Sequence, residues 1–238
     1  MSNAANSTDL SAQKDWALRA LRALFPASCG IGCAIETWPP PVSLPVAEAA
    51  AVETAAEVRK KSFAAGRTAA REALEQIGFA QAVIPAGADR APVWPEGAIG
   101  SISHAGGLAV AVAGRRSDLP AIGVDLEETG AVGRELWDQL MVTSEKRFLA
   151  SLPDGDQGRF ATVIFSIKEA FYKYQYPLVR RWFNFQDLTV EIAPAIEEWR
   201  LTLAEPIQIA GKPAACFRGC YRIGNAFTLA AAYAVGGQ

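Results

Sequence analysis

Two carboxylates lie two residues apart in Ile122–Glu128, where apolar and polar residues alternate strictly. This alternation predicts a strand with Gly123, Asp125 and Glu127 on one face and about 7 Å between the acids. Carboxylates this close repel each other unless a cation neutralises them, and a hard divalent cation is the commonest solution. Gly123 leaves the same face open beside the acids, which favours a site. The alternative is an edge strand whose acids lie in water.

A carboxylate and an ammonium recur four residues apart in the helix predicted over Phe165–Lys173. Glu169 and Lys173 share the helix face turned away from the apolar stripe, with Ser166 beside them. Alone, this pair fits a solvated ion pair that stabilises a helix by a few tenths of a kcal/mol. The apolar stripe, expected to be buried, recurs at helical spacing: Ile164, Ile167, Phe171 and Tyr174.

The single histidine of the chain, His104, follows a predicted strand that begins at Ile99. Gly106-Gly107 predicts a tight turn, and the apolar run after it predicts the second strand of a hairpin. Ser101 and Ser103 share one face of the first strand. A ligand can come close to a strand end beside glycines, which favours a functional His104 over a structural one.

Basic residues gather on a helix predicted over 48–76: Arg59, Lys60, Lys61, Arg67 and Arg71. Gly66 within this helix lowers its stability by about 1 kcal/mol relative to alanine and indicates close packing or a nearby ligand. The alternative is an ordinary solvated face. Arg90 lies in the Pro-rich loop that follows.

The composition excludes several classes of protein. Half of the 238 residues are apolar and the net charge is −2, so nothing points to nucleic acid or an anionic membrane as a partner. No signal peptide and no apolar run of about twenty residues is present. The four cysteines show no metal spacing that a nearby histidine could complete, and the single histidine argues against a mixed zinc site. We expect reduced thiols in a cytoplasmic protein: Cys29, Cys33, Cys216 and Cys220.

The order of the predicted elements indicates an α+β fold. Each half of the chain runs from helices to strands, with a boundary near Pro120 that separates residues 1–120 from 121–238. The second half is predicted to hold the metal strand and the helix with Glu169. It then continues with four strands, over 188–192, 198–204, 215–222 and 227–235.

Three motifs, in this order, together resemble one family. Gly100-Ser101-Ile102-Ser103-His104 comes first, followed by Gly123-Val124-Asp125-Leu126-Glu127 and Phe165-Ser166-Ile167-Lys168-Glu169-Ala170-Phe171-Tyr172-Lys173. They resemble the 4′-phosphopantetheinyl transferases of the surfactin- and enterobactin-synthetase type. Phe63–Arg67 and Pro92–Gly97 resemble the enterobactin branch, and the resemblance spans about residues 57–190. It implies two similar α+β halves related by a pseudo-twofold axis.

The resemblance implies transfer of 4′-phosphopantetheine from coenzyme A to a serine of an acyl- or peptidyl-carrier protein. The other product would be adenosine 3′,5′-bisphosphate, and Mg²⁺ would be the cofactor because attack on a pyrophosphate needs charge neutralisation. We expect a monomer that binds neither nucleic acid nor membrane. Carriers of fatty-acid, polyketide and peptide synthetases, including those of secondary metabolism, all fit the sequence.

The resemblance also assigns roles by position. Asp125, Glu127 and Glu169 match the three metal-binding acids, and Glu169 matches the catalytic base. Lys173 matches a lysine that binds the phosphates and protonates the leaving group. Phe165 stands where many relatives have tryptophan and keeps an aromatic ring. Further residues are expected to bind coenzyme A: Arg59, Arg67, Arg90, Ser103, His104 and Lys168.

Two other functions fit the same residues. A Mg²⁺-dependent nucleotide pyrophosphohydrolase shares the chemistry but uses a positioned water. A coenzyme A-binding module without turnover is the third option, although Glu169 and Lys173 argue against it. The stripe Leu136–Met141 is either a docking surface for the carrier or part of the core.

Overall fold

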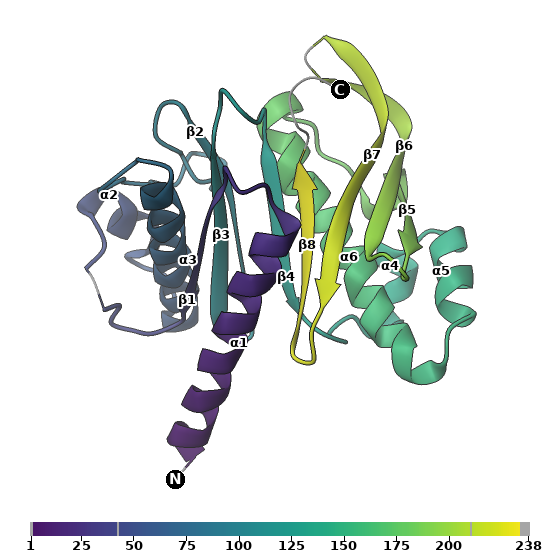
Figure 1. The fold of residues 1–238 in the computed structure, drawn as a ribbon, viewed down its shortest axis with the longest axis horizontal. Helices are drawn as coiled ribbons and strands as arrows, with labels where there is room; N and C mark the ends of the chain where they lie inside the picture. The colour runs from purple at the N-terminus through teal and green to yellow at the C-terminus, as the bar shows by residue number, and fades with distance from the viewer. Residues whose placement is uncertain (1, 42, 210, 234–238) are drawn as a thin grey trace. The chain divides into compact units, whose positions relative to one another are not determined.

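The computed structural model describes residues 2–41, 43–209 and 211–233 (Figure 1). The chain divides into two compact units. Unit 1 ends at Ile122, and unit 2 covers Gly123–Tyr233. Both units combine helices with antiparallel strands, so the predicted α+β class is confirmed. None of the helices in these ranges is long and apolar enough to span a membrane.

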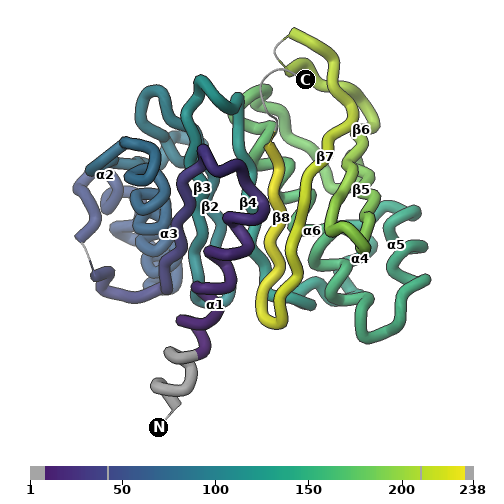
Figure 2. The backbone as a smooth tube through the Cα atoms, viewed as in Figure 1, coloured from purple at the N-terminus to yellow at the C-terminus, as the bar shows by residue number. Residues whose placement is uncertain are grey.

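Unit 1 contains an antiparallel sheet of order β1-β3-β2. Helix α3 packs on this sheet, α1 also packs against β1 and β3, and Figure 2 lets the chain be followed from α1 into β1. The predicted hairpin is confirmed, since β2 and β3 pair up to Ala105 and Leu108 around the glycine turn. The elements are α1 (Ser2–Leu24), β1 (Gly30–Ile35), α2 (Val46–Ala49), η1 (Ala50–Val52), α3 (Glu57–Gln76), β2 (Ala98–Ala105) and β3 (Leu108–Arg115).

The helix predicted over 48–76 is wrong in its first part. The chain forms the short helices α2 and η1, and α3 begins only at Glu57. The buried Glu48 carboxylate accepts hydrogen bonds from Arg71 Nη1, at 2.7 Å, and from the Ile84 amide, at 2.8 Å. A continuous helix would hold residues 48 and 71 about 35 Å apart. The break therefore lets the acid fold back beside α3.

Unit 2 contains a five-stranded sheet of order β4-β8-β7-β6-β5, and α6 packs on β8 (Figure 1). The four strands predicted after this helix are confirmed. Pro177 lies inside the last turn of α6. The elements are β4 (Ile122–Glu128), η2 (Arg134–Leu136), α4 (Trp137–Leu140), α5 (Thr143–Ala150), α6 (Asp154–Val179), η3 (Phe185–Asp187), β5 (Leu188–Ala193), β6 (Glu198–Ile209), β7 (Lys212–Ile223) and β8 (Phe227–Tyr233).

The stripe Leu136–Met141 is divided between core and surface. Trp137 is 7% exposed and Met141 is fully buried, whereas Leu136 keeps 37% of its surface in solvent. The short helices η2 and α4 turn the larger side chains inward. A docking role for Met141 is therefore wrong, and Leu136 is the exposed large apolar residue of the stripe.

Candidate active site

Gly123 lets helix α6 pack directly on strand β4. A Cβ atom at this position would collide with the carbonyl oxygen of Ala170 on α6. The sequence had suggested an open face beside the acids. That expectation is wrong, because helix α6 covers this face. Ser166, expected on the outer helix face, is buried at this contact, where its Oγ donates a 3.4 Å hydrogen bond to the Asp125 carbonyl oxygen.

This close packing brings a lysine of α6 to the first acid of β4. Lys173 Nζ lies 2.6 Å from Asp125 Oδ1. Asp125 is 2% exposed, and the side chain of Lys173 keeps 25% of its surface in solvent. A buried carboxylate needs a positive partner, and the ammonium of Lys173 supplies that charge.

The charges of Asp125 and Lys173 also shift the pKa values of Glu127 and Glu169. Burial, with the nearby negative charges of Asp125 and Glu169, raises the pKa of Glu127 to about 7, while Lys173 opposes this rise. Burial also raises the pKa of Glu169, where Lys173 lowers it and Asp125 adds to the rise. The structure thus brings Asp125, Glu127, Glu169 and Lys173 into one electrostatic cluster within unit 2, here called the acidic cluster.

The acidic cluster has donors of the type that a hard divalent cation prefers, because all three acids offer carboxylate oxygens. Among the side chains that the structure describes, no group of three His, Cys, Asp or Glu residues is arranged to hold a metal ion. The residue types suit Mg²⁺, but in this structure the positive charge beside Asp125 is the ammonium of Lys173.

Glu169 also lines a cavity of about 110 Å³ in unit 2, here called the aromatic pocket. Tyr172 and Trp182 meet edge-to-face, with ring centroids 5.0 Å apart. Trp182 keeps 72% of its surface in solvent. The lining residues are Lys168, Glu169, Phe171, Tyr172, Trp182, Phe183, Phe185 and Leu188.

Comparisons with known proteins decide the family. A sequence model of the 4′-phosphopantetheinyl transferase N-terminal domain matches residues 47–114, and one of the 4′-phosphopantetheinyl transferase superfamily matches residues 121–216. The transferase Svp of Streptomyces mobaraensis is 32% identical over 176 residues, which cover 72% of this chain and 70% of Svp. The chain belongs to the 4′-phosphopantetheinyl transferase superfamily.

Two further relatives agree with this assignment. The 4′-phosphopantetheinyl transferase PptT of Mycobacterium tuberculosis is 29% identical over 191 residues, which cover 77% of this chain and 83% of PptT. Enterobactin synthase component D of Escherichia coli is 39% identical over 127 residues, 52% of this chain and 58% of that protein. The resemblance drawn from the three motifs is confirmed, and the chain is an enzyme of the phosphopantetheinyl transferase class.

The structure contradicts the phosphate-binding role of Lys168 in this transferase. Its side chain is fully buried, and Nζ donates to Glu145 Oε2 at 2.7 Å, to the Leu140 carbonyl at 2.8 Å and to the Phe185 carbonyl at 3.0 Å. These three bonds use all three hydrogens of the ammonium. No donor is left for a phosphate.

The predicted coenzyme A residues of unit 1 lie on three segments. Ser103 and His104 are neighbours on β2, so their side chains point to opposite faces of the sheet. Ser103 is buried, whereas His104 is exposed with Nδ1 3.8 Å from Glu36 Oε1. Arg59 is exposed on α3, and Arg90 is exposed in the loop before β2.

Arg67, also on α3, is only 5% exposed. Its Nε donates to the Ile84 carbonyl at 2.6 Å, and its guanidinium stacks over the Phe63 ring at 4.3 Å. Burial lowers the pKa of Arg67 to about 10, and Arg59 and Arg71 add to this effect against Glu48. Arg67 therefore ties α3 to the segment before the loop.

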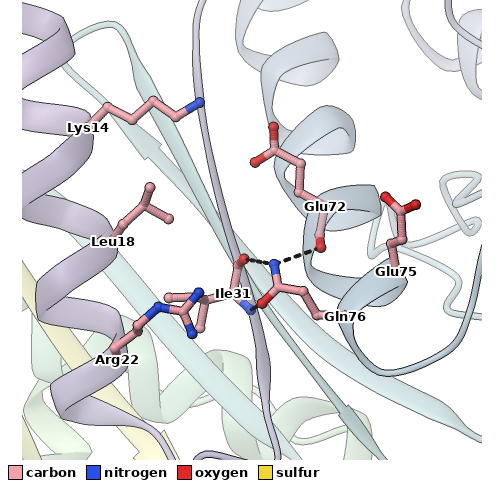
Figure 3. A pocket seen from close by; sticks show the side chains of 7 residues that line it. All are labelled: Lys14, Leu18, Arg22, Ile31, Glu72, Glu75 and Gln76. Carbon is pink, nitrogen blue, oxygen red and sulfur yellow. Dashed lines mark hydrogen bonds between the residues drawn. The ribbon is translucent and has the colours of Figure 1, made fainter.

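A second cavity in unit 1, of about 390 Å³, lies beside the outer edge of β1 (Figure 3). Gln76 closes this edge, because its side-chain amide donates to the Ile31 carbonyl at 2.6 Å and accepts from the Ile31 amide at 3.2 Å. The cavity contains none of the predicted site residues. Its lining residues are Lys14, Leu18, Arg22, Ile31, Glu72, Glu75 and Gln76.

Proposed function

We propose that this transferase moves 4′-phosphopantetheine from coenzyme A to a serine hydroxyl of an acyl- or peptidyl-carrier protein. The bond from the serine oxygen to the β-phosphorus would form, and the bond from that phosphorus to the bridging oxygen would break, releasing adenosine 3′,5′-bisphosphate. One observation carries the proposal. The acidic cluster, held by the Lys173–Asp125 contact of 2.6 Å, shares Glu169 with the aromatic pocket.

Glu169 suits the role of the base that takes the serine proton. A base is most effective when its pKa lies near the working pH, and burial raises the pKa of Glu169 above its ordinary value. The positive charge of Lys173 opposes this rise in the pKa of Glu169. Glu169 would then remove the proton as the serine oxygen attacks.

Lys173 is the cation nearest to the buried acid. With part of its side chain in solvent, it can turn toward an incoming phosphate while staying close to Asp125. The leaving bisphosphate oxygen gains negative charge as the bond breaks, and an ammonium can stabilise it or give it a proton. We assign this role to Lys173.

Asp125, Glu127 and Glu169 would hold Mg²⁺, which when bound would neutralise the pyrophosphate charge. Asp125 would orient Lys173 and exclude water by its burial. Glu127, with a pKa of about 7, would give up its proton as the cation binds.

The aromatic pocket supports the choice of substrate. Its aromatic rings and Leu188 suit the methyl and methylene groups of the narrow arm of coenzyme A beyond the pyrophosphate, an arm that also carries two amides and a hydroxyl. Arg59, Arg67, Arg90, Ser103 and His104 stay our candidates for binding the phosphates of coenzyme A. Arg59 and Arg90 are the more available of the three arginines because both are exposed.

The partner would be a carrier protein from a fatty-acid, polyketide or peptide synthetase, and we propose that the enzyme acts as a cytoplasmic monomer. Leu136 is our remaining candidate from the predicted docking stripe, because it is 37% exposed and follows the metal strand in the chain.

The test is mass spectrometry of several apo carriers incubated with the enzyme, coenzyme A and Mg²⁺. We expect at least one carrier to gain one phosphopantetheine, and excess EDTA to stop the reaction. Coenzyme A that is cleaved while every carrier keeps its mass would support a pyrophosphohydrolase instead. Coenzyme A that is bound and left intact would support a binding module.

A further inference from the structure

Glu145 and Lys168 form a fully buried ion pair in unit 2. Glu145 Oε2 lies 2.7 Å from Lys168 Nζ, and both side chains have no exposed surface. Glu145 lies in the first turn of α5, and Lys168 precedes Glu169 on α6. The proposed reaction uses neither charge directly, so the pair calls for another explanation.

The pair binds four peptide groups, three of them remote in the sequence from the side chain that binds them. The Val142 amide donates to Glu145 Oε2 at 2.8 Å, and the Val190 amide donates to Oε1 at 2.7 Å. Lys168 donates to the carbonyls of Leu140 and Phe185. The end of α4, the start of α5, η3 and β5 are therefore all tied to the helix that carries Glu169.

Two of these ties hold one wall of the aromatic pocket. Phe185 lines the pocket, and its carbonyl is bound by Lys168. Leu188 also lines the pocket, and it begins the strand whose Val190 amide is bound by Glu145. The Phe185 ring packs on Phe165 of α6 at 5.6 Å between centroids. The ion pair thus sets how far this wall stands from Glu169.

Stability alone does not explain such a pair. Desolvating two charges is costly, and a well-packed apolar pair of similar volume is often equally stable or more so. An apolar pair would leave the four peptide groups without partners, and each buried unsatisfied group costs about 1–3 kcal/mol. What the charges supply is a fixed geometry for the segments that they join.

We infer that Glu145 and Lys168 are positioning residues that hold the Phe185–Leu188 wall of the aromatic pocket against α6, and so set the binding of the pantetheine arm. This inference rests on the proposed function. It predicts that the affinity for coenzyme A changes and the affinity for adenosine 3′,5′-bisphosphate does not, because only coenzyme A has the arm. Disturbing the pair should weaken coenzyme A binding and spare the bisphosphate.

The test compares Glu145→Gln with the wild type by isothermal titration calorimetry in the presence of Mg²⁺. The new side-chain NH₂ would face a donor in either orientation, the Val190 amide at one position or Lys168 Nζ and the Val142 amide at the other, so one side of the network must open. We expect the ratio of the two Kd values, coenzyme A over bisphosphate, to rise roughly tenfold as the arm loses its contacts. Glu197→Gln is the matched control, because Glu197 pairs with Arg222 in the same unit and does not line the pocket.

Each outcome has one meaning. An unchanged ratio in Glu145→Gln, with wild-type binding and transfer intact, would overturn the inference and leave the proposed function standing. A wild type that binds neither ligand and modifies no carrier would refute the proposed function instead. If Glu145→Gln fails to fold, Lys168→Gln and the double variant Glu145→Gln/Lys168→Gln replace it. Two facing amides can bond to each other, so a double variant with a lower ratio than Lys168→Gln supports the inference, and an equal ratio contradicts it.

Discussion

The two units repeat one scaffold. In unit 1 the order strand, helix, hairpin gives β1, α3, β2 and β3, with β3 between the other strands. In unit 2 the same order gives β4, α6, β7 and β8, with β8 beside β4 and β7 beyond it. A glycine of the first strand touches a helix carbonyl in both: Gly32 meets Ala69, and Gly123 meets Ala170.

What differs is the set of side chains around this contact. Two residues after the glycine, unit 1 has the buried Ala34 where unit 2 has Asp125. Three residues after the helix alanine, Glu72 accepts a 3.2 Å hydrogen bond from the Cys33 amide, whereas Lys173 pairs with the Asp125 carboxylate. Unit 1 uses the scaffold for packing, and unit 2 adds three charged side chains to it.

The largest predicted difference in kcat concerns the residue just before the alanine that meets the glycine, Ala170 on α6 and Ala69 on α3. This residue is Glu169 in unit 2 and Thr68 in unit 1, where Thr68 Oγ1 donates to the Ala64 carbonyl within its own helix. Glu169→Gln removes the proposed base, and kcat should fall about 10²–10⁴-fold. Thr68→Val should leave kcat within about twofold, because Thr68 has no ionisable group and its hydroxyl bonds within its own helix. Steady-state transfer to a carrier protein measures both, and equal effects would contradict the contrast.

The glycines should matter for folding in both units. Gly123→Ala and Gly32→Ala each force a Cβ against a backbone carbonyl that cannot move without its helix. Each should lower the unfolding free energy by about 1–3 kcal/mol or more, as measured in urea. In Gly123→Ala the activity per folded molecule should also fall, because the shift moves Glu169 and Lys173 away from Asp125. Full specific activity in that variant would show that the close contact does not position the site.

The smallest effect concerns pH. The pKa of Glu127 rises from its ordinary 4.5 to about 7 in the fold, so the contribution of this group to stability is complete below about pH 4.5 and is lost as the pH rises through about 7. Glu127→Gln cannot ionise. In EDTA its Tm should therefore exceed that of the wild type by about 2–4 °C above pH 7, with the gap closing toward low pH.

Saturating Mg²⁺ should remove this advantage of Glu127→Gln, because a cation stabilises the ionised carboxylate. Thermal unfolding with and without the metal measures it. Parallel Tm curves across the pH range would show that Glu127 is not perturbed in the fold.

Most of the acidic cluster could be predicted from local residue spacing. Strand alternation put Asp125 and Glu127 on one face, and helical spacing put Glu169 and Lys173 on another. Both patterns follow from backbone geometry alone. Gly123 was interpreted as leaving space for a ligand. It instead allows the close approach of α6 to β4, which is set by tertiary packing that the sequence pattern does not show.

The errors arise where long-range contacts override local rules. Lys168 was expected to bind coenzyme A, and only the fold shows that it is buried in an ion pair with Glu145, 23 positions earlier. The helix over 48–76 has no local breaker, and the partner that favours its break, Ile84, lies beyond it. Trp182 and Phe185 follow α6 without any periodic pattern, so the sequence offered no signal for the aromatic pocket.

The central claim is that only one of the two scaffolds forms a cation site. The most direct test is calorimetric titration of Mg²⁺ into the full chain in the presence of coenzyme A, for the wild type and Asp125→Asn. The account predicts one ion per chain and the loss of that binding in Asp125→Asn, with the helical circular dichroism unchanged. Two ions per chain, or Asp125→Asn that binds Mg²⁺ as tightly as the wild type, would contradict it.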